Sequence, residues 1–228
     1  MQHVLIAGAS RGLGLGLVQA FLARGDRVHA IVRSAGNAAL AELAARHPGQ
    51  LQVQVCDLAG ERAAAEIADA LGDARLDVAL FNAGISGPAH QDERQATRDE
   101  LAELFLVNAI APLRLAKALA PHVERDGVLA FMSSQMGSVE LALSASMPLY
   151  GASKAALNSL LQSWSHSAEA PSATLLALHP GWVKTDMGGA GAPLSVEQSV
   201  AGLVATIAAH RGAGGCHFVD YQHQTLPW

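Results

Sequence analysis

The sequence predicts a doubly wound α/β fold, a parallel sheet with helices on both faces. Short apolar runs alternate with segments of helical length along the whole chain. A connection of that length lets consecutive strands run parallel and places its helix on a face of the sheet. The 228 residues contain no Pro/Ser-rich linker or compositional break, so we expect a single domain over residues 1–228.

The apolar runs give the expected elements in chain order. We expect strands at residues 3–7, 27–32, 51–56, 76–81, 127–132, 173–179 and 216–220. The alanine-rich segments 38–45 and 59–71 carry Leu, Ile and charged residues at helical spacing and predict helices that cover the sheet. Further helices are expected to open at the glycine-rich turn after the first strand, near Pro148 and near Ser195.

Composition excludes several classes of protein. Half of the residues are hydrophobic and 15% are charged, which indicates a folded chain, and the net charge of -5 gives no general attraction to nucleic acid or an anionic membrane. Cys56 and Cys216 have no metal-ligand spacing. With no signal-peptide pattern and no uninterrupted apolar run of about 18 residues, we expect a soluble cytoplasmic protein that binds neither nucleic acid nor membrane.

A glycine-rich turn follows the first strand and opens a helix with an apolar face. Such a turn brings backbone close to a pyrophosphate, and the helix N-terminus supplies free N–H groups. The turn predicts a dinucleotide site with backbone and side-chain contributions from Gly8, Ser10, Arg11, Gly12, Leu13 and Gly14.

The residues after the second strand indicate NADP(H) as the cofactor. No carboxylate stands after Val32 to hold a ribose hydroxyl; Arg33 and Ser34 follow instead, and Arg11 lies in the glycine turn. Two guanidinium groups suit a 2′-phosphate. The alternative is that Arg33 is simply solvated. Asp57, followed by Leu58, ends the third strand and either accepts from the adenine amino group or caps the next helix.

Tyr150 and Lys154 form a candidate acid–base pair. Four residues apart at the start of a helix, they share one face. A phenol has an ordinary pKa of about 10 and donates protons, and a nearby cation makes its phenolate accessible. Ser134, at the carboxyl end of the fifth strand, is placed to orient a carbonyl oxygen. Ser133 is interpreted as a turn residue.

Asn108 is a polar residue in an otherwise apolar helical segment. Pro112, four positions on, cannot donate to the Asn108 carbonyl, so we expect a kink there. The freed oxygen could hold a water that links Lys154 to solvent. A kinked helix without proton transfer is the alternative.

The motifs together resemble the short-chain dehydrogenase/reductase family over essentially the whole chain. They are the glycine turn, Asp57, Asn82-Ala83-Gly84, Asn108, Ser134, Tyr150-x-x-x-Lys154 and Pro180-Gly181-Trp182-Val183-Lys184-Thr185. The resemblance implies a Rossmann-type seven-stranded sheet and a catalytic tetrad of Asn108, Ser134, Tyr150 and Lys154. It also implies a nicotinamide carboxamide held by Val183 and Thr185. Two positions depart from the family pattern. Ala7 stands where the family usually has Thr before the glycine turn, and Phe81 replaces the first Asn of the usual Asn-Asn-Ala-Gly.

The segments 132–138 and 153–158 and the ending Leu226-Pro-Trp228 resemble the C-factor and sniffer-type carbonyl reductases. This resemblance implies an NADPH-dependent reductase of aldehydes, ketones or quinones, with an NADP(H)-binding signalling module as the alternative. The apolar candidates for a substrate pocket are Met136, Leu141, Leu143, Met147 and Trp182.

The helix from Pro148 carries two stripes, one through Tyr150, Lys154, Leu157 and Leu161 and one through Ala156, Leu160 and Trp164. Two stripes need two partners, the sheet and a second subunit. We therefore expect a homodimer or homotetramer, as the resemblance also implies.

Overall fold

The computed structural model describes residues 1–228, which form one sheet of seven parallel strands in the order β3-β2-β1-β4-β5-β6-β7. The strands are β1 (His3–Ala7), β2 (Arg27–Val32), β3 (Leu51–Val55), β4 (Leu76–Phe81), β5 (Val123–Met132), β6 (Thr174–His179) and β7 (Cys216–Asp220). The doubly wound fold predicted from the sequence is confirmed. The order reverses between β1 and β4, where open sheets of this kind bind their ligands.

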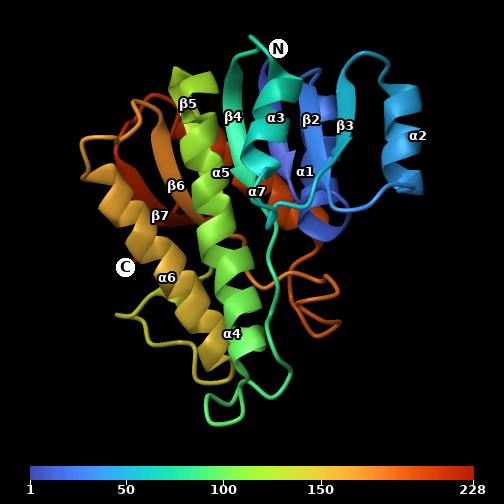
Figure 1. Cartoon of the computed structure of the whole chain (residues 1–228). Coiled ribbons are helices and arrows are strands. Elements are labelled where there is room, and N and C mark those ends of the chain that lie inside the picture. Colours follow the sequence, from blue (N-terminus) through green and yellow to red (C-terminus); the bar gives the residue numbers. More distant parts are fainter.

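Helices cover both faces of the sheet (Figure 1). The helices α1 (Gly12–Ala23), α2 (Ala38–Arg46) and α7 (Val196–Ala209) pack on one face. The other face carries α3 (Ala63–Leu71), α5 (Ala111–Leu119) and α6 (Pro148–Ser165). The remaining helix, α4 (Arg98–Phe105), leads into α5.

The core has two halves, one on each side of the sheet. Along β1, Val4 and Ile6 belong to the half under α1 and α7, and Leu5 and Ala7 to the half under α3, α5 and α6. All four side chains are fully buried. Burial on both faces is why inner strands such as β1 and β6 read as continuous apolar runs, whereas the edge strand β3 alternates apolar and polar residues.

Several boundaries differ from the expectation by one to four residues. β5 begins at Val123, four residues early, and α3 begins at Ala63, four residues late. The delay in α3 has a local cause: the Gly60 N–H donates to the Asp57 carbonyl and the Ala63 N–H to the Gly60 carbonyl, so tight turns occupy this segment. β3 ends at Val55, and β6 begins at Thr174, each one residue shorter than expected.

A continuous helical run extends from Arg98 to His122 and is long and apolar enough to cross a membrane by length and composition alone. Its Leu104, Leu115 and Leu119 are buried inside this fold, so the apolar composition also serves the core. Within the run, residues Leu106–Ile110 form a π-helical turn in which the Ala111 N–H donates to the Leu106 carbonyl. The irregularity expected around Asn108 and Pro112 is therefore a π turn, a feature often found at functional sites.

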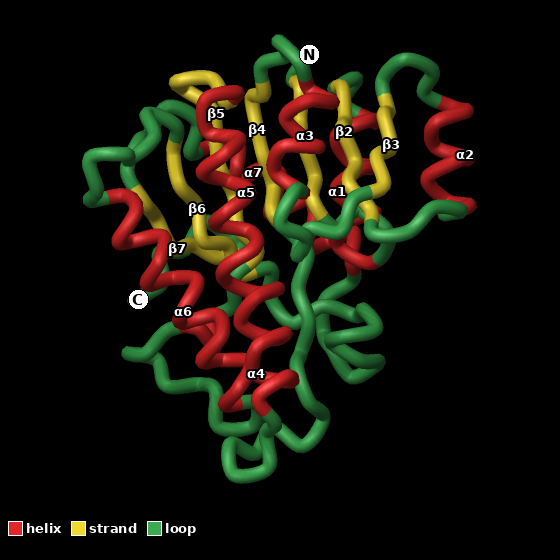
Figure 2. The backbone as a smooth tube through the Cα atoms, in the orientation of Figure 1, coloured by secondary structure: helices red, strands yellow, loops and turns green.

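Long loops gather at the carboxyl ends of the strands (Figure 2). They connect β4 to α4 (residues 82–97), β5 to α6 (residues 133–147) and β6 to α7 (residues 180–195). The glycine turn, Asp57, Asn82-Ala83-Gly84, Ser134 and the segment 180–185 all follow strands at this edge.

Candidate active site

A cleft of about 710 Å³ opens at the carboxyl edge of the sheet, between the glycine turn, the end of β4 and α6. It brings together most of the predicted cofactor residues and the tyrosine–lysine pair. The predicted residues that line it are Gly8, Ser10, Arg11, Gly12, Leu13, Arg33, Asp57, Leu58, Asn82, Ala83, Gly84, Tyr150, Lys154, Pro180 and Thr185.

The remaining predicted residues lie behind or beside the cleft; they are Gly14, Ser34, Asn108, Ser134, Gly181 and Val183. Ser34 is solvent-exposed. Val183 is buried and forms a β-bridge with Leu194. A Cβ at Gly181 would lie 2.4 Å from the Leu194 side chain, so this glycine is needed for close packing.

The glycine turn has the close backbone packing that a pyrophosphate site needs. Gly8 has a φ of 91°, and a Cβ at Gly14 would lie 2.0 Å from the Gly8 carbonyl oxygen. No side chain caps the first turn of α1, so its amide groups are available to an anion. The structure therefore fits a nicotinamide dinucleotide at this turn.

The two departures from the family pattern have compensating contacts. The Asn82 side-chain amide donates to the Gly8 carbonyl at 2.8 Å, and the Asn82 and Ala83 N–H groups both donate to the Ala7 carbonyl. Phe81 stacks on Phe131, with ring centroids 4.7 Å apart. The turn is thus fastened to β4 without the threonine hydroxyl.

The two arginines that are candidates for binding a 2′-phosphate, Arg11 and Arg33, are exposed at the edge of the cleft. Arg33 is free of any ion pair, whereas Arg11 pairs with Asp186, which follows Thr185 in the β6–α7 loop. Thr185 also contacts the turn, since a Cβ at Gly12 would touch its methyl group at 3.4 Å. The loop after β6 therefore reaches over the glycine turn. Asp57 lines the cleft and accepts the Ala59 N–H at 3.1 Å, inside a turn and not at the start of a helix.

Tyr150 and Lys154 lie one turn apart on α6. Loss of hydration raises the pKa of Tyr150 to about 12, and a hydrogen bond with Ser134 opposes the rise. Burial lowers the pKa of Lys154 to about 8. The Lys154 ammonium lies 5.7 Å from the centroid of the tyrosine ring and donates to the Met132 carbonyl at 2.8 Å. Tyr150 is thus a protonated acid at neutral pH beside a largely charged lysine.

Asn108 fastens the loop after β4 to α6. Its side-chain oxygen accepts the Ile85 N–H and its side-chain nitrogen donates to the Ile85 carbonyl, both at 2.8 Å, and to the Ser153 hydroxyl at 2.9 Å. A Cβ at Gly84 would lie 3.2 Å from the Asn108 oxygen and 3.4 Å from the Lys154 nitrogen. Gly84 therefore separates Asn108 from Lys154.

The adjacent serines at the end of β5 have different partners. Ser133 donates to the Asn158 side chain at 2.7 Å and joins β5 to α6. Ser134 accepts the Met136 N–H and bonds to Tyr150. The distinction made from the sequence, with a structural Ser133 and a site Ser134, agrees with these contacts.

Sequence reasoning missed three residues that shape this site. A Cβ at Gly137 would lie 2.8 Å from the Lys154 backbone, and one at Gly151 would lie 2.3 Å from Ser144, so both glycines let the β5–α6 segment lie directly on α6. Gly151 lies between Tyr150 and Lys154 in the sequence, so a glycine inside this motif was a signal of close packing at this turn. Gln91 accepts the Tyr150 N–H at 3.0 Å, and no sequence pattern marked it.

Comparison with known proteins assigns the family. Residues 2–192 match the family model of the short chain dehydrogenases. The chain belongs to the short-chain dehydrogenase family. The C-signal protein of Myxococcus xanthus is 37% identical over 158 residues, which cover 67% of this short-chain dehydrogenase and 93% of that relative.

Solved structures of the same family superpose closely. A carbonyl reductase from Pseudomonas aeruginosa PAO1 has 54% identity and a TM-score of 0.95, with both chains covered completely. The same reductase in complex with NADP has 55% identity and a TM-score of 0.94, again over both full chains. This short-chain dehydrogenase therefore resembles carbonyl reductases, and the resemblance to the C-factor-like subgroup that the sequence indicated is confirmed.

Proposed function

We propose that this protein is an NADPH-dependent carbonyl reductase that converts an aldehyde, ketone or quinone to an alcohol. The observation that carries the proposal is the position of Tyr150, bonded to Ser134 and one turn from buried Lys154, in the same cleft as the glycine turn. An acid and its cation in the dinucleotide cleft, with an orienting hydroxyl beside them, match proton delivery to a carbonyl oxygen.

Several features support NADP(H) as the cofactor. Gly8, Gly12 and Gly14 allow the dinucleotide backbone to approach, while Arg11 and Arg33 offer guanidinium groups to a 2′-phosphate. No acidic residue follows Val32. The similar Pseudomonas aeruginosa reductase has been crystallised with NADP.

The chain's own residues supply the proton and hold the substrate oxygen. NADPH bound in the cleft supplies the hydride. Tyr150 donates its phenol proton to the carbonyl oxygen, and the Ser134 hydroxyl orients that oxygen. The Lys154 charge favours the phenolate left behind, because an opposite charge lowers the pKa of a phenol. The proton must then return to Tyr150 from solvent, and the π turn around Asn108 is the candidate route that the sequence suggested.

Apolar side chains near the loops favour small apolar substrates. Leu141, Leu143, Trp182 and Met187 are all exposed in the loops that follow β5 and β6, and large exposed apolar groups commonly mark a binding surface. Met187 lines the cleft itself. These residues, and not a charged pocket, are expected to meet the part of the substrate beyond its carbonyl.

The test is NADPH oxidation against a panel of aldehydes, ketones and quinones, with NADH alongside. We expect turnover with NADPH that Tyr150→Phe lowers by at least about 10²-fold while NADPH still binds. The half-buried Tyr221→Phe variant, a change at the other tyrosine of the chain, serves as the matched control. Equal activity of native protein and Tyr150→Phe would remove the proposed role of the phenol.

The relation to C-signal supports one alternative, an NADP(H)-binding signalling module with little turnover. This alternative predicts tight NADPH binding and no turnover on any carbonyl of the panel. A biological output unaffected by Tyr150→Phe would favour it.

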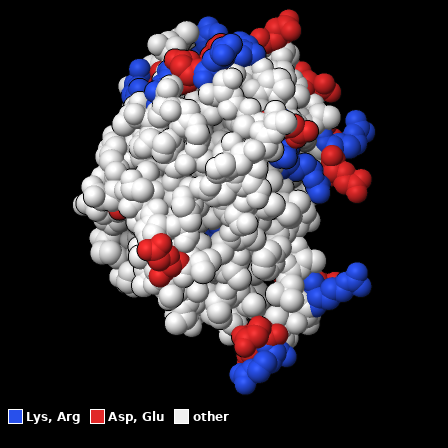
Figure 3. Space-filling model, turned by 90° about the vertical axis from the view of Figure 1, so that its left-hand side faces the viewer, with Lys and Arg blue, Asp and Glu red and all other residues white.

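We also propose that the protein is a homodimer in a reducing, cytoplasmic environment. The side of the molecule with α6 and β7 is nearly free of charged residues (Figure 3), and the only charged residue among the 18 of α6 is the buried Lys154. The outer face of α6 carries the small residues Ala152 and Ser159, which allow a second helix to approach. Both apolar stripes of α6, one of which was expected at this contact, instead pack on the chain's own core. Cys56 and Cys216 are free thiols.

A further inference from the structure

The catalytic helix α6 begins without a cap of its own. Its N-cap residue, Met147, makes no side-chain hydrogen bond to the first turn. Tyr150 is the third residue of the helix, so its N–H is one of the groups that the helix itself leaves unsatisfied. The Gln91 side-chain oxygen accepts this N–H at 3.0 Å from a position 59 residues earlier in the chain. The cap of the helix is thus supplied by the β4–α4 loop.

Gln91 is itself firmly held. Its side-chain nitrogen donates to the carbonyls of Ser86 and Pro88, both at 2.8 Å. The residue is 9% exposed and has a φ of 51°, a left-handed conformation that is costly for a residue with a Cβ. A buried amide with all of its bonds directed to backbone, on a strained residue, indicates a position that the surrounding structure fixes.

The carbonyl of Tyr150 is tied to the same loop by a second route. The Ser153 hydroxyl donates to the Tyr150 carbonyl at 2.7 Å and accepts from Asn108 at 2.9 Å. Asn108 in turn holds Ile85 by both backbone groups. The loop is therefore connected to both backbone polar groups of Tyr150. Gln91 accepts its N–H, and Asn108 and Ser153 connect the loop to its carbonyl.

We propose that Gln91 is a positioning residue for Tyr150, with Asn108 and Ser153 as the other half of one backbone clamp. The clamp fixes the helix turn from which the phenol projects, and so sets the hydroxyl against Ser134 and the substrate oxygen. A displacement of about 1 Å in a reacting group costs as much as 10²-fold in rate. The inference rests on the proposed function, in which Tyr150 is the proton donor.

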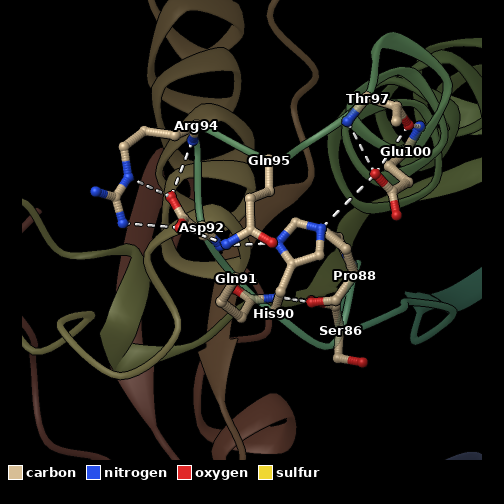
Figure 4. A network of polar contacts seen from close by, with 9 residues as sticks. All are labelled: Ser86, Pro88, His90, Gln91, Asp92, Arg94, Gln95, Thr97 and Glu100. Atoms are coloured by element: carbon tan, nitrogen blue, oxygen red, sulfur yellow. Dashed lines mark hydrogen bonds and ion pairs between the residues drawn. The ribbon is translucent and has the colours of Figure 1, made fainter.

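The rest of the loop is held without Gln91 (Figure 4). Asp92 accepts from the Arg94 guanidinium at 2.8 and 2.9 Å and from Gln95 at 2.7 Å, while its N–H donates to His90. Thr97 and Glu100 close the loop with a reciprocal cap at the start of α4. Removal of the Gln91 side chain therefore leaves most of the loop's polar contacts in place.

The test compares Gln91→Met with Gln95→Met, the same change four residues away in the same loop. The side-chain hydrogen bond of Gln95 goes to Asp92, within the loop. We expect Gln91→Met to lower kcat about tenfold with KM and the NADPH dissociation constant within about twofold of native. Gln95→Met should leave all three unchanged. An unchanged kcat in Gln91→Met, or losses confined to KM, would overturn the proposal.

Gln91→Gly is the second variant, because glycine adopts the left-handed conformation without strain and so protects against a failure to fold. It should show the same selective loss of kcat. Amide hydrogen exchange gives a readout without turnover: exchange at Tyr150 should be faster in both Gln91 variants and unchanged in Gln95→Met. If the native protein reduces no carbonyl, the proposed function fails, and unchanged exchange at Tyr150 would independently refute the clamp.

Discussion

The side chain of Asn82 donates to the carbonyl oxygen of Gly8 at 2.8 Å, which fastens the glycine turn to the end of β4. This bond holds the turn in the conformation that exposes the amides of α1. We expect Asn82→Ala to raise the NADPH dissociation constant about tenfold, equivalent to roughly 1.4 kcal/mol, the strength of one buried hydrogen bond. Fluorescence titration measures this, with the exposed-loop variant Gln95→Ala as control. Equal affinities would show that the turn holds its shape without Asn82.

The two arginines at the edge of the cleft should set the choice between NADPH and NADH. We expect Arg11→Ala and Arg33→Ala each to weaken NADPH binding about tenfold, since charge-assisted hydrogen bonds contribute about 1.5–3 kcal/mol. NADH binding should change little. Asp186→Asn removes the ion-pair partner of Arg11 and should strengthen NADPH binding. Arg94→Ala, outside the cleft, is the control; a parallel loss for NADPH and NADH would contradict the assignment.

We expect Lys154 to reduce the stability of the folded protein, although the reaction requires it. Because the pKa of Lys154 is lowered to about 8 from 10.5 by burial, the folded state binds this proton less tightly than the unfolded state. The charged lysine therefore costs about 3 kcal/mol below pH 8, and the cost falls as the pH rises towards 10.5. We expect Lys154→Met to raise the free energy of unfolding by about 2 kcal/mol at pH 7, after loss of the Met132 hydrogen bond, and to abolish reduction. Urea unfolding at pH 7 and 9.5 tests this, and a gain that does not shrink at pH 9.5 would be inconsistent with it.

His179 should contribute to acid unfolding. Burial lowers its pKa from 6.5 to about 4, and its Nδ1 has no hydrogen-bond partner. The unfolded state therefore takes up a proton below about pH 6.5 that the folded state takes up only near pH 4, so stability falls across this window as the pH drops. We expect His179→Leu to flatten that fall by roughly 3 kcal/mol. The exposed His166→Leu is the control, and parallel curves for native protein and His179→Leu would refute the prediction.

The charge-free side of α6 should be a subunit contact. A charge placed there is costly if a second copy buries it, because an unpaired buried charge must lose its hydration. We expect Ser159→Arg to convert a dimer to a monomer in sedimentation velocity. Arg114→Glu, on the exposed side of α5, should change the mass little. A native protein that sediments as a monomer at micromolar concentration would rule out the contact.

The sequence predicted the sheet well because its inner strands, such as β1, β4 and β6, are buried on both faces. The runs ending at Ala7, Val32 and Phe81 are bounded by glycine or polar residues, and each forms a strand with the expected bounds. The start of α3 was missed because alanine favours helix equally at residues 59 and 63, and the turn at Gly60 decided between them.

The site was predictable where its residues are close together in the sequence. Tyr150 and Lys154 share a helix turn, and Gly8 to Gly14 form one turn, so their spacing gave their arrangement. Gln91 was not predictable, because its contact to Tyr150 spans 59 residues and depends on a single left-handed residue in a loop without periodicity. The expectation that one stripe of α6 meets a second subunit was wrong, because an apolar stripe does not reveal which neighbour covers it and both stripes pack on the chain's own core.

The absence of a side chain at Gly151 allows the β5–α6 loop to pack against the helix turn that carries Tyr150. A Cβ at Gly151 would lie 2.3 Å from the Ser144 side chain. The β5–α6 loop therefore packs directly on the helix turn that carries Tyr150. A larger residue at position 151 would displace both this loop and Tyr150. A library intended to broaden the range of substrates should therefore spare Gly151 and vary Val139, Leu141 and Leu143, whose exposed side chains can change in size without moving the helix.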